Sequence, residues 1–547
     1  MNNNHLKAEV VIIGAGAVGG MLAHRLAKSG VDVLLLEAGP RIDRAEAVQH
    51  FFKSAEKGPN APYPSTSYAP HPMRSDDYYV QAGPDRFNGS YLRGVGGSSW
   101  HWTGFAVRFR PSDFTMRSRF GVGVDWPIGY DHLQDYYETI EKEWGVGGFD
   151  GYEHGAPRRA GFPLPGIPMS YSDQRIAAAL KDSDWTIGPF IHARNPVPFD
   201  NRPPCCGSAS CVPICPIGAK YDGSVHVGKA EAAGARLMAE TVVDKILVEK
   251  NQQISGVTFR RSNGERGTAV GRIYVLCAHA IESPKLLLLS AQENAPNGVA
   301  NRSDVVGRYL MSQVDLDTRA LAKEPLYPYR GPTTTGGIME FRDGEFRKDY
   351  AAVGTSFMNR GWRTGLGPMQ SAERLVKSGQ TGTVLRRSLN DRATRELAIN
   401  SSAETLPERD NRIVPDFTRL DASGTPRPKI YFKIDDYTKK GLEQVHQRHD
   451  AIVKALHCTE VTTDEPSLAS AIIAGTTRMG KNPADSVVDP FCRSHDHANL
   501  FIVGPGSFPT MPINAPTMTA VALGLRSLEQ IMPDLKSGRF NLQGQPA

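Results

Sequence analysis

The sequence predicts an α/β fold. A domain on a parallel sheet is assembled from discontinuous segments, and an α+β substrate domain on an antiparallel sheet is inserted between them. The chain opens with a β-α-β unit, an apolar strand at 8–13, a glycine-rich turn with a helical stretch, and a second strand at 31–39. Further apolar strand-like segments lie at 240–289 and 499–504. Between them, residues 330–440 carry scattered strand-like segments such as RPKIYFKI, which favour an antiparallel sheet.

The composition is that of a large globular enzyme. The chain has 547 residues, of which 40% are hydrophobic and 22% charged, and this excludes disorder, collagen-like repeats and a small disulfide scaffold. The 54 glycines and 39 prolines favour a loop-rich enzyme over a helical bundle. The net charge is +5 and no Lys/Arg block is dense, so we expect no nucleic-acid partner.

Two kinds of membrane-related segment are not expected. No apolar stretch reaches the ~18 residues of a membrane span. The N-terminus, MNNNHLKAEV, lacks the charged and apolar regions of a signal peptide. By its own sequence the chain is expected in the cytoplasm, unless a partner carries it elsewhere.

The remaining elements follow in chain order. The first helix, MLAHRLAKSG, closes at Gly30, and residues 40–90 are rich in proline and aromatic residues without a clear period, which predicts irregular loops. The sequence then predicts a helix within 125–145, three strands (VVDKILVE, ISGVTFRR, AVGRIYVLCAH) and a helix (IESPKLLLLS) within 240–290, a helix at 438–456, a strand at 499–504 and a final helix from near Pro516 to about Met532.

The first motif is Gly14-x-Gly16-x-x-Gly19 between the first strand and the first helix. Gly14 permits the tight turn, Gly16 lets the backbone approach a pyrophosphate, and Gly19 permits close contact of helix and sheet. Glu37 ends the second strand, where a carboxylate accepts hydrogen bonds from a ribose. Together these features predict a Rossmann-type dinucleotide site, without separating NAD from FAD.

The second motif is the loop GVGGSSWHW, which contains Gly96, Gly97, Ser98 and His101. Here the sequence resembles the glucose–methanol–choline (GMC) oxidoreductase family, in which such a loop lies along the flavin. The resemblance implies FAD as the cofactor. It leaves open whether His101 is bonded covalently to the flavin or only contacts its edge.

The third motif is a cluster of four cysteines within eleven residues, Cys205, Cys206, Cys211 and Cys215. Soft thiolate ligands converging from one short loop favour an iron–sulfur cluster. Zinc is the rival, although its ligand pairs are usually well separated in sequence, and a disulfide or buried thiols are the other alternative. Adjacent cysteines seldom bind one metal together, so one of Cys205 and Cys206 is expected to act with Cys211 and Cys215, and three ligands fit a [3Fe-4S] cluster.

Most of the chain resembles one branch of that family. The segment CCGSASCVPICPIGAKYDGSVHVGKAEAAGA, FRDGEFR and GTTRMGKNPADSVVD are similar to the large catalytic subunits of bacterial membrane-bound glucose, fructose and gluconate dehydrogenases. Carried over by position, the resemblance implies Cys205, Cys211 and Cys215 as ligands of a [3Fe-4S] cluster, with Cys206 as a neighbour. It also implies two partners, a small export-chaperone subunit and a cytochrome c subunit, at the periplasmic face of the inner membrane.

The C-terminal helix also follows the family pattern. In the family this helix points its N-terminus at the flavin, where its dipole stabilises the anion formed on reduction. Here the helix starts around Asn514-Ala-Pro-Thr-Met-Thr, which places Thr517 near the flavin. Asn514 stands where the family has a His or Asn that hydrogen-bonds the substrate oxygen.

The sequence departs from the family at the catalytic base. The family pattern His-x-x-Gly-Thr reads Ile472-Ile-Ala-Gly-Thr here, and an isoleucine accepts no proton. The family's Asp-His-Pro segment is also changed, to Met311-Ser-Gln-Val-Asp. His279, His495 and His497 are candidate replacements, although a structural role is the expectation for each.

The sequence is compatible with three functions. The first is an FAD-dependent dehydrogenase that oxidises a hydroxyl group of a sugar, polyol or related small molecule and relays electrons through the cluster to a cytochrome or quinone, rather than an oxidase. The second is a flavoenzyme of different chemistry on the same scaffold, such as desaturation, elimination or oxidation of a specialised metabolite. The third is a catalytically weak, cofactor-holding subunit of a complex.

The expected domain boundaries follow from these assignments. The FAD-binding domain is expected at 1–50, 88–115, 200–312 and 475–547, and it includes the cysteine loop 205–215. The substrate-binding domain and its covering loops are expected at 51–87, 116–199 and 313–474.

Overall fold

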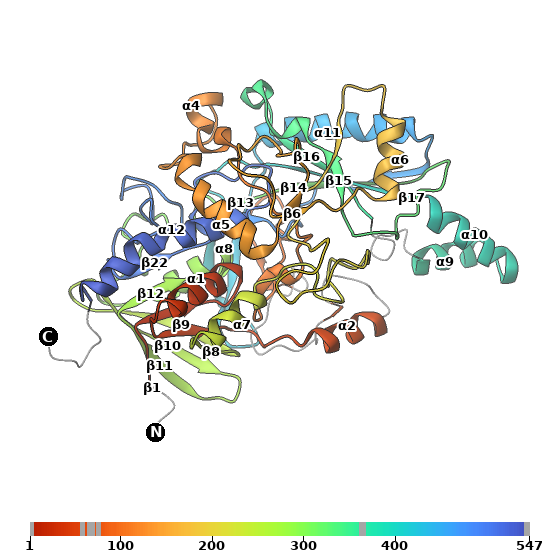
Figure 1. Ribbon diagram of the computed structural model, residues 1–547. Helices are drawn as coiled ribbons and strands as arrows, with labels where there is room; N and C mark the ends of the chain where they lie inside the picture. Colours follow the sequence, from red (N-terminus) through yellow and green to blue (C-terminus); the bar gives the residue numbers. More distant parts are fainter. Residues whose placement is uncertain (1–4, 55–60, 63–71, 73–77, 360–367, 541–547) are drawn as a thin grey trace.

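The parallel sheet of the fold is built from the two ends and the middle of the chain. The computed structural model of the protein describes residues 5–54, 61–62, 72, 78–359 and 368–540. Its five-stranded sheet has the order β22-β12-β2-β3-β8, and every neighbouring pair is parallel. The neighbours β22 and β12 lie side by side in Figure 1. The strands are β2 (Val10–Ile13), β3 (Val33–Leu36), β8 (Arg236–Met238), β12 (Ile273–Leu276) and β22 (Leu500–Ile502). The predicted assembly from discontinuous segments is confirmed.

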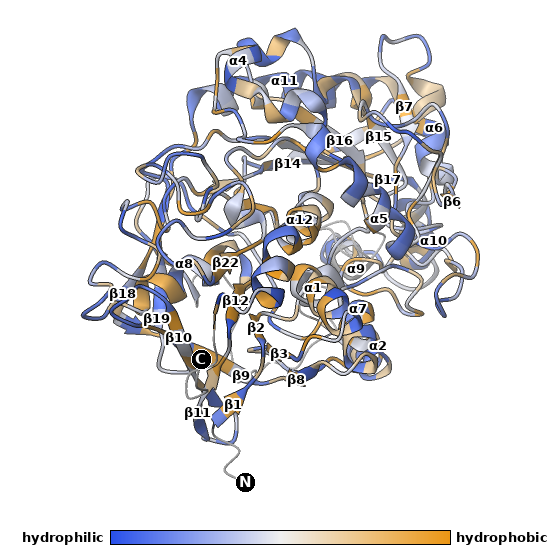
Figure 2. Cartoon of the chain, turned by 60° about the vertical axis from the view of Figure 1, so that its left-hand side comes forward, coloured by the Kyte–Doolittle hydropathy of each residue, from blue (hydrophilic) through white to orange (hydrophobic). Residues whose placement is uncertain are grey.

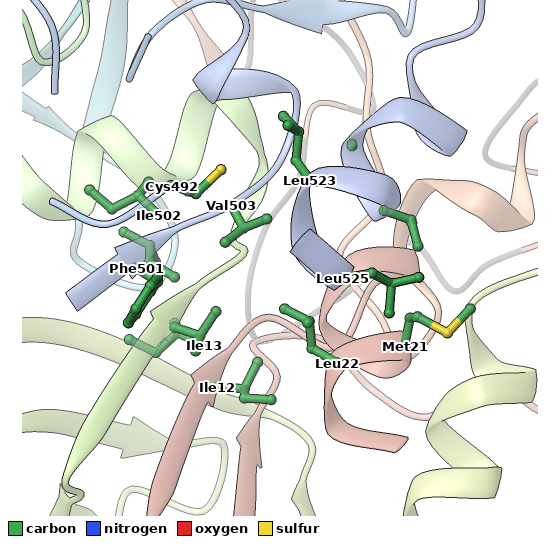
Figure 3. Packing of buried hydrophobic residues seen from close by; sticks show 14 of the residues in the cluster. Ile12, Ile13, Met21, Leu22, Cys492, Phe501, Ile502, Val503, Leu523 and Leu525 are labelled. Carbon is green, nitrogen blue, oxygen red and sulfur yellow. The ribbon is translucent and has the colours of Figure 1, made fainter. Parts of the chain in front are cut away.

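Helices cover this sheet because its strands are apolar on both faces. Every residue of β2, β3, β12 and β22 is buried, as expected for a parallel sheet packed on both sides. Helix α1 (Ala17–Lys28) packs against α7 (Ser224–Ala232) and α12 (Thr517–Lys536). Figure 3 shows side chains from α1 and α12, among them Leu22 and Leu523, gathered with Ile13 and Phe501 from the strands.

A smaller sheet extends the same domain. It has the order β1-β11-β10-β9, with β1 (His5–Lys7), β9 (Thr241–Val248), β10 (Ile254–Arg261) and β11 (Arg266–Val270). Two of the three strands expected in this region are confirmed as β9 and β10. The third, AVGRIYVLCAH, divides into the end of β11, in this smaller sheet, and β12, in the parallel sheet, with a break at Gly271–Arg272. The helix α8 (His279–Leu289) follows as predicted.

The second layer is the predicted antiparallel sheet. Its six strands have the order β20-β14-β17-β16-β15-β7, and all its pairs are antiparallel. They are β7 (Ile187–Pro189), β14 (Val314–Leu321), β15 (Gly336–Ile338), β16 (Val353–Phe357), β17 (Glu396–Ala403) and β20 (Thr459–Thr463). Helix α11 (Asp436–Ala455) covers one face of the sheet, where His449 bonds the Thr318 and Ser401 hydroxyls at 2.8 Å each.

Two sequence expectations differ from the structure. The segment RPKIYFKI forms β19 (Pro426–Tyr431), which does not join the six-stranded sheet but pairs with β18 (Arg412–Leu420) and, in parallel, with β4 (Val80–Gln81). A strand pattern specifies a buried face but not the partner strand.

The other difference concerns residues 40–90, which were expected to form irregular loops. They contain the helix α2 (Arg44–Lys53), and part of the remainder lies outside the described residues. The Asp43 carboxylate caps this helix by accepting the Glu46 N–H at 2.9 Å. Ala47 and Phe51, four residues apart, are buried on one face.

The other elements lie around these layers. They are α4 (Met116–Phe120), α5 (Gln134–Trp144), α6 (Tyr171–Ala179), α9 (Pro368–Lys377), α10 (Gly382–Arg395), β5 (Gly147–Gly148), β6 (Leu164–Pro165), β13 (Met311–Ser312) and β21 (Ile473–Ala474). Figure 2 shows hydrophobic colour on β12 and β22 in the interior and hydrophilic colour along peripheral loops. Within the described ranges, no helix combines the length and apolarity that a bilayer crossing requires.

Candidate cofactor and substrate site

A cavity of about 650 Å³ lies between the two large sheets. Its lining includes the carboxyl ends of β2 and β3, the residues after β22, the start of α12, and one side of the antiparallel sheet. Ligands of open parallel sheets bind at these carboxyl ends. The predicted residues that line the cavity are Gly14, Gly16, Glu37, Gly97, Ser98, His101, Asn514 and Thr517.

The first glycine motif forms a tight turn between β2 and α1. Gly14 has a φ of +104°, and a Cβ there would lie 2.6 Å from the Cys277 carbonyl oxygen. A Cβ on Gly19 would lie 2.0 Å from the Gly14 oxygen, so helix and strand meet in direct contact. A Cβ on Gly16 would meet no atom within 4 Å, which leaves its backbone open toward the cavity at the N-terminus of α1.

Glu37 is tied to the same motif. Its Oε2 accepts the Ala15 N–H at 2.8 Å and its Oε1 accepts the Gly39 N–H at 2.9 Å. The side chain is buried, and this burial raises the pKa of its carboxyl above the usual range despite those two bonds. The carboxylate therefore holds the glycine turn and faces the cavity at once.

The second glycine loop lies directly against the first. Gly96 has a φ of +101°, and a Cβ there would lie 2.5 Å from the Trp100 Nε1. A Cβ on Gly97 would lie 3.1 Å from the Gly16 Cα. The Ser98 hydroxyl accepts the Leu92 N–H at 3.2 Å, and His101 faces the cavity just beyond. The two loops, about 80 residues apart in sequence, form one continuous wall.

Asn514 is held in one orientation by a buried arginine. The Arg342 guanidinium donates to the Asn514 Oδ1 and, at 2.9 and 3.1 Å, to the Ile513 carbonyl oxygen. The Asn514 Nδ2 points to the Asp113 carboxylate at 3.5 Å. Rotating the amide would turn its NH₂ group toward the guanidinium, so Arg342 determines which atom faces which side. Burial, with Arg110 nearby, lowers the pKa of Arg342 well below its usual value.

Ile472, which stands at the position of the family's catalytic His, lines the cavity. Its carbonyl oxygen accepts the Ser312 hydroxyl at 3.1 Å. Gln313 on the neighbouring segment donates from Nε2 to the Pro512 and Asn514 carbonyl oxygens at 3.4 and 3.3 Å. The segment 311–315 and Ile472 therefore border the loop that carries Asn514.

The three candidate histidines do not gather around Asn514. His497 bonds the Gln252 carbonyl oxygen at 2.7 Å and accepts the Ala300 N–H, and His495 bonds the Ser486 hydroxyl at 3.0 Å. Neither lines the cavity. His279 does line the cavity, where it stacks on Tyr91 with ring centroids 4.3 Å apart. It lies on the side of the first glycine turn, because Cys277, two residues before it, is in contact with Gly14. Burial lowers the pKa of His279 to about 4.

The sequence reasoning missed a charged group on the cavity wall. Glu282 accepts from Tyr91 and forms ion pairs with Arg93 and with Lys285, the latter at 2.8 Å. Burial acts to raise the pKa of Glu282, but the two cations hold this pKa far below its usual range. No local pattern joins Arg93 to Glu282 across almost 190 residues, so sequence spacing could not reveal this contact.

The cysteine loop borders the cavity through Val212, whereas its thiols lie behind the wall. Cys211 and Cys215 are buried, Cys206 is exposed, and all the cysteines are free of disulfides. The Cys205 sulfur accepts the Gly207 N–H at 3.4 Å, and the Cys211 thiol donates to the Ser208 carbonyl oxygen at 3.3 Å. In the part of the chain that the structure describes, no three His, Cys, Asp or Glu side chains are arranged to hold a metal ion.

Buried cations surround these thiols. Lys220 donates to the carbonyl oxygens of Trp100, Trp102 and Cys211 at 2.8, 2.6 and 2.8 Å. Arg194 donates to the Thr103 carbonyl oxygen at 2.6 Å, while its Nε and Nη1 have no partner. Burial acts to raise the pKa of Cys211, yet Arg194 holds it below its usual value.

A third buried cation completes this surround. Arg202 donates to the Trp144 carbonyl oxygen at 2.8 Å and also leaves two nitrogens unpaired. Among the described residues, neither it nor Arg194 or Lys220 forms an ion pair with a carboxylate. Buried charges need a counter-charge, so these three cations favour an anionic group beside the cysteine loop.

Models of known families match three parts of the chain. The two models described as GMC oxidoreductase match residues 193–315 and 407–524. A model described as ketopantoate reductase PanE/ApbA matches residues 10–78, which include the first glycine motif.

Individual proteins match nearly the whole length. The chain is 36% identical to the fructose dehydrogenase large subunit of Gluconobacter japonicus, over 98% of this chain and 100% of that protein. It is 28% identical to the 2-methyl-1,2-propanediol dehydrogenase of Mycolicibacterium austroafricanum, over 96% and 95%. The crystal structure of pyridoxine 4-oxidase from Mesorbium loti shares the fold with a TM-score of 0.65 and 17% identity, over 96% and 99% of the two chains.

Proposed function

The chain belongs to the GMC oxidoreductase family, and from this premise we propose that it is an FAD-dependent dehydrogenase of a sugar, a polyol or a related hydroxylated molecule. The observation that carries the proposal is the cavity in which two touching glycine loops and the N-terminus of α12 meet Asn514. When bound, the flavin supplies the hydride acceptor, its N5 atom.

The two loops have separate roles in holding this cofactor. Gly14, Gly16 and Gly19 form the turn for the pyrophosphate at the start of α1, and Glu37 accepts the ribose hydroxyls. Gly96, Gly97, Ser98 and His101 are the proposed contacts of the flavin ring. Thr517 begins α12 and lines the cavity, so the positive end of the helix dipole faces the cavity. No acidic residue in the first turn of α12 neutralises this end.

Asn514 is the proposed catalytic contact of the substrate. An amide N–H there donates to the oxygen of the reacting hydroxyl and keeps the adjacent C–H aimed at the cofactor. Arg342 is a positioning residue, because it holds the Asn514 Oδ1 and keeps the NH₂ group on the other side, where one N–H faces Asp113 and the second is the proposed donor to the substrate. Ile472 supplies no base, so the hydroxyl proton would pass to water in the cavity.

An iron–sulfur cluster is the proposed exit for electrons. Cys205, Cys211 and Cys215 are its proposed ligands, and Arg194, Arg202 and Lys220 supply the buried positive charge for an anionic [3Fe-4S] group. Lys220 bonds both the loop of His101 and the loop of Cys211, so it links the proposed flavin site to the proposed cluster. A relay of this kind serves a cytochrome or quinone acceptor rather than oxygen.

Partner subunits are part of this proposal. The relative from Gluconobacter japonicus is by its name a large subunit, which supports a complex with a small export-chaperone subunit and a cytochrome c subunit. Such partners would place the chain at the periplasmic face of the inner membrane. The division into FAD-binding and substrate-binding segments given above remains part of the same proposal.

The function is tested by anaerobic assay of the purified protein with an artificial electron acceptor and a panel of sugars and polyols. We expect reduction of the dye by at least one compound and slow peroxide formation in air. No dye reduction with any compound of the panel, together with rapid peroxide formation, contradicts the proposal.

The glycine motif yields a prediction about cofactor binding. Gly16→Ala adds a Cβ in open space, so the chain is expected to fold normally but to lose FAD, because the methyl group occupies the path of the pyrophosphate. Gly19→Ala is expected to fold poorly, because its Cβ would overlap the Gly14 oxygen. Flavin absorbance per chain and thermal unfolding measure the two effects.

Gly228→Ala is the matched control, since it lies in α7 with nothing within 4 Å and is expected to keep both flavin and stability. Full flavin content in Gly16→Ala contradicts the assignment of this turn.

Ile472 favours a second candidate, a flavoenzyme of different chemistry such as desaturation or elimination. Ile472→His restores the family's base, and under the main proposal sugar oxidation is expected to rise by about 100-fold or more if proton removal limits the rate. The rate of dye reduction across pH 5–9 measures this effect. A wild type that is inert toward alcohols, with strong sugar oxidation only in Ile472→His, supports the second candidate instead.

A third candidate is a cofactor-holding subunit of a complex. Flavin that stays oxidised with all the substrates of the panel, but is reduced by a partner protein, favours this reading.

A further inference from the structure

The cavity side of the antiparallel sheet carries an ordered set of polar side chains. Strand alternation brings Asp315 and Asp317 of β14 to this side, while Val314 and Leu316 enter the core. Asn400 and Ser402 of β17 and Ser356 of β16 face the same cavity. We call these five residues the polar wall.

The strand register arranges the wall in two rows. In the first row Asp315 pairs with Ser402, which pairs with Gly354 on β16. In the second row Asp317 pairs with Asn400, which pairs with Ser356. Rows two residues apart along a strand are separated by about 7 Å, and neighbouring strands by about 4.8 Å.

The first row lies beside the loop that carries Asn514. A Cβ on Gly354 would be 3.2 Å from the Ile513 Cγ1, directly before Asn514. Gln313, two residues before Asp315 and also on the cavity, donates to the Asn514 carbonyl oxygen at 3.3 Å. The second row is one further step from Asn514, so the two rows lead outward from the reacting carbon.

The wall presents hydrogen-bond acceptors to the cavity. Ser402 donates to the Asp315 Oδ1 at 2.5 Å, and Asn400 donates from Nδ2 to the Asp317 Oδ1 at 2.9 Å. In the second row, two acceptor oxygens, Asp317 Oδ2 and Asn400 Oδ1, have no partner among the described residues. Acceptors of this kind match the O–H and N–H donors of a ligand and repel a carboxylate.

We propose that the polar wall selects the substrate by binding hydroxyl or amino groups remote from the oxidised carbon. This inference rests on the proposed function and narrows its substrate class. The preferred substrate is a chain or ring with several hydroxyls, long enough to reach Asp317 from Asn514. A short diol reaches only the first row, and a sugar acid places its anionic end against two carboxylates.

The test uses four compounds and one substitution. D-sorbitol, D-glucamine and D-gluconate share a six-carbon polyol chain and end in a hydroxymethyl, ammonium or carboxylate group, and 1,2-propanediol is the short diol. Each is measured anaerobically with the holoenzyme, by KM where it is oxidised and by its inhibition constant where it is not. Asp317→Asn is the variant, and Asp464→Asn, at the edge of the same sheet and paired with Arg319 outside the cavity, is the matched control.

The expected pattern separates binding from chemistry. In the wild type, D-sorbitol and D-glucamine bind more tightly than D-gluconate. Asp317→Asn weakens D-sorbitol by about 10-fold or more and removes most of the preference for D-glucamine over D-gluconate. It leaves the constant for 1,2-propanediol within about twofold, because the short diol does not reach the second row. Asp464→Asn changes none of these values.

Two outcomes overturn the proposal and differ from each other. If the wild type oxidises hydroxyl compounds but Asp317→Asn leaves the D-sorbitol constant unchanged, or weakens D-sorbitol and 1,2-propanediol equally, the polar wall is not the selecting surface, and the proposed function stands. If neither these compounds nor the sugars of the panel reduce the bound flavin, the proposed function fails and the inference fails with it.

Discussion

Replacing Cys211 by serine is expected to produce a protein that keeps its flavin but contains no iron–sulfur cluster. A hydroxyl group is a poor ligand for iron compared with a thiolate, and Cys211 is buried beside the cations Arg194 and Lys220. Delivery of electrons to a cytochrome or quinone acceptor is expected to fall by about 100-fold. Anaerobic bleaching of the flavin by substrate should continue, because that step precedes the relay.

Cys206→Ser is the matched control for this prediction. Cys206 is exposed and adjacent to a proposed ligand, so its replacement should keep both iron and acceptor activity. Iron analysis of the two variants also decides between neighbours. Iron lost in Cys206→Ser and retained in Cys205→Ser would reverse the assignment of that ligand, and iron retained in Cys211→Ser contradicts the proposed ligand set.

Replacing Asn514 by alanine is expected to lower kcat by about 100- to 1000-fold, the range observed when one preorganised donor is lost from an active site. Asn514 lies in the loop just before α12 and in contact with Arg342, so its amide is placed before the substrate arrives. Flavin content should stay at the wild-type level. Rapid-reaction measurement of anaerobic flavin reduction isolates the affected step.

Arg342→Gln tests the positioning role on the same step. We expect a smaller loss of kcat than in Asn514→Ala, since the amide remains but is no longer held. Asn263→Ala, in the exposed β10–β11 turn, controls for the substitution itself. An unchanged rate of flavin reduction in Asn514→Ala contradicts the catalytic assignment.

Local patterns predicted much of this architecture. The apolar strands β2 and β3 are contiguous signals and pair as expected, and Glu37 after β3 accepts the Ala15 N–H within the glycine turn. The final helix was also predicted near its observed start at Thr517. Such features depend on neighbours within one β-α-β unit or one helix, which a sequence shows directly.

Long-range pairing accounts for what sequence reasoning did not find. The contact of Arg342 with Asn514 joins residues more than 170 positions apart, and β19 joins β4 across nearly 350. Strand periodicity specifies which side chains share a face but not which strand lies beside them. The two rows of the polar wall have the same origin, because they exist only in the register of β14 with β17.

The helix α2 was missed for a different reason. Its signals, an Asp43 cap and two buried residues one turn apart, are short and lie in a segment dominated by prolines and aromatic residues farther along. A helix of ten residues has little intrinsic stability, so packing rather than composition decides whether it forms.

The visible spectrum, iron content and low-temperature electron paramagnetic resonance spectrum of anaerobically purified protein test the central claim most directly. The account predicts flavin absorbance superimposed on a broad iron–sulfur band, about three iron atoms per chain, and the signal of an oxidised three-iron cluster. A preparation that holds zinc or no metal, or that lacks flavin, contradicts it.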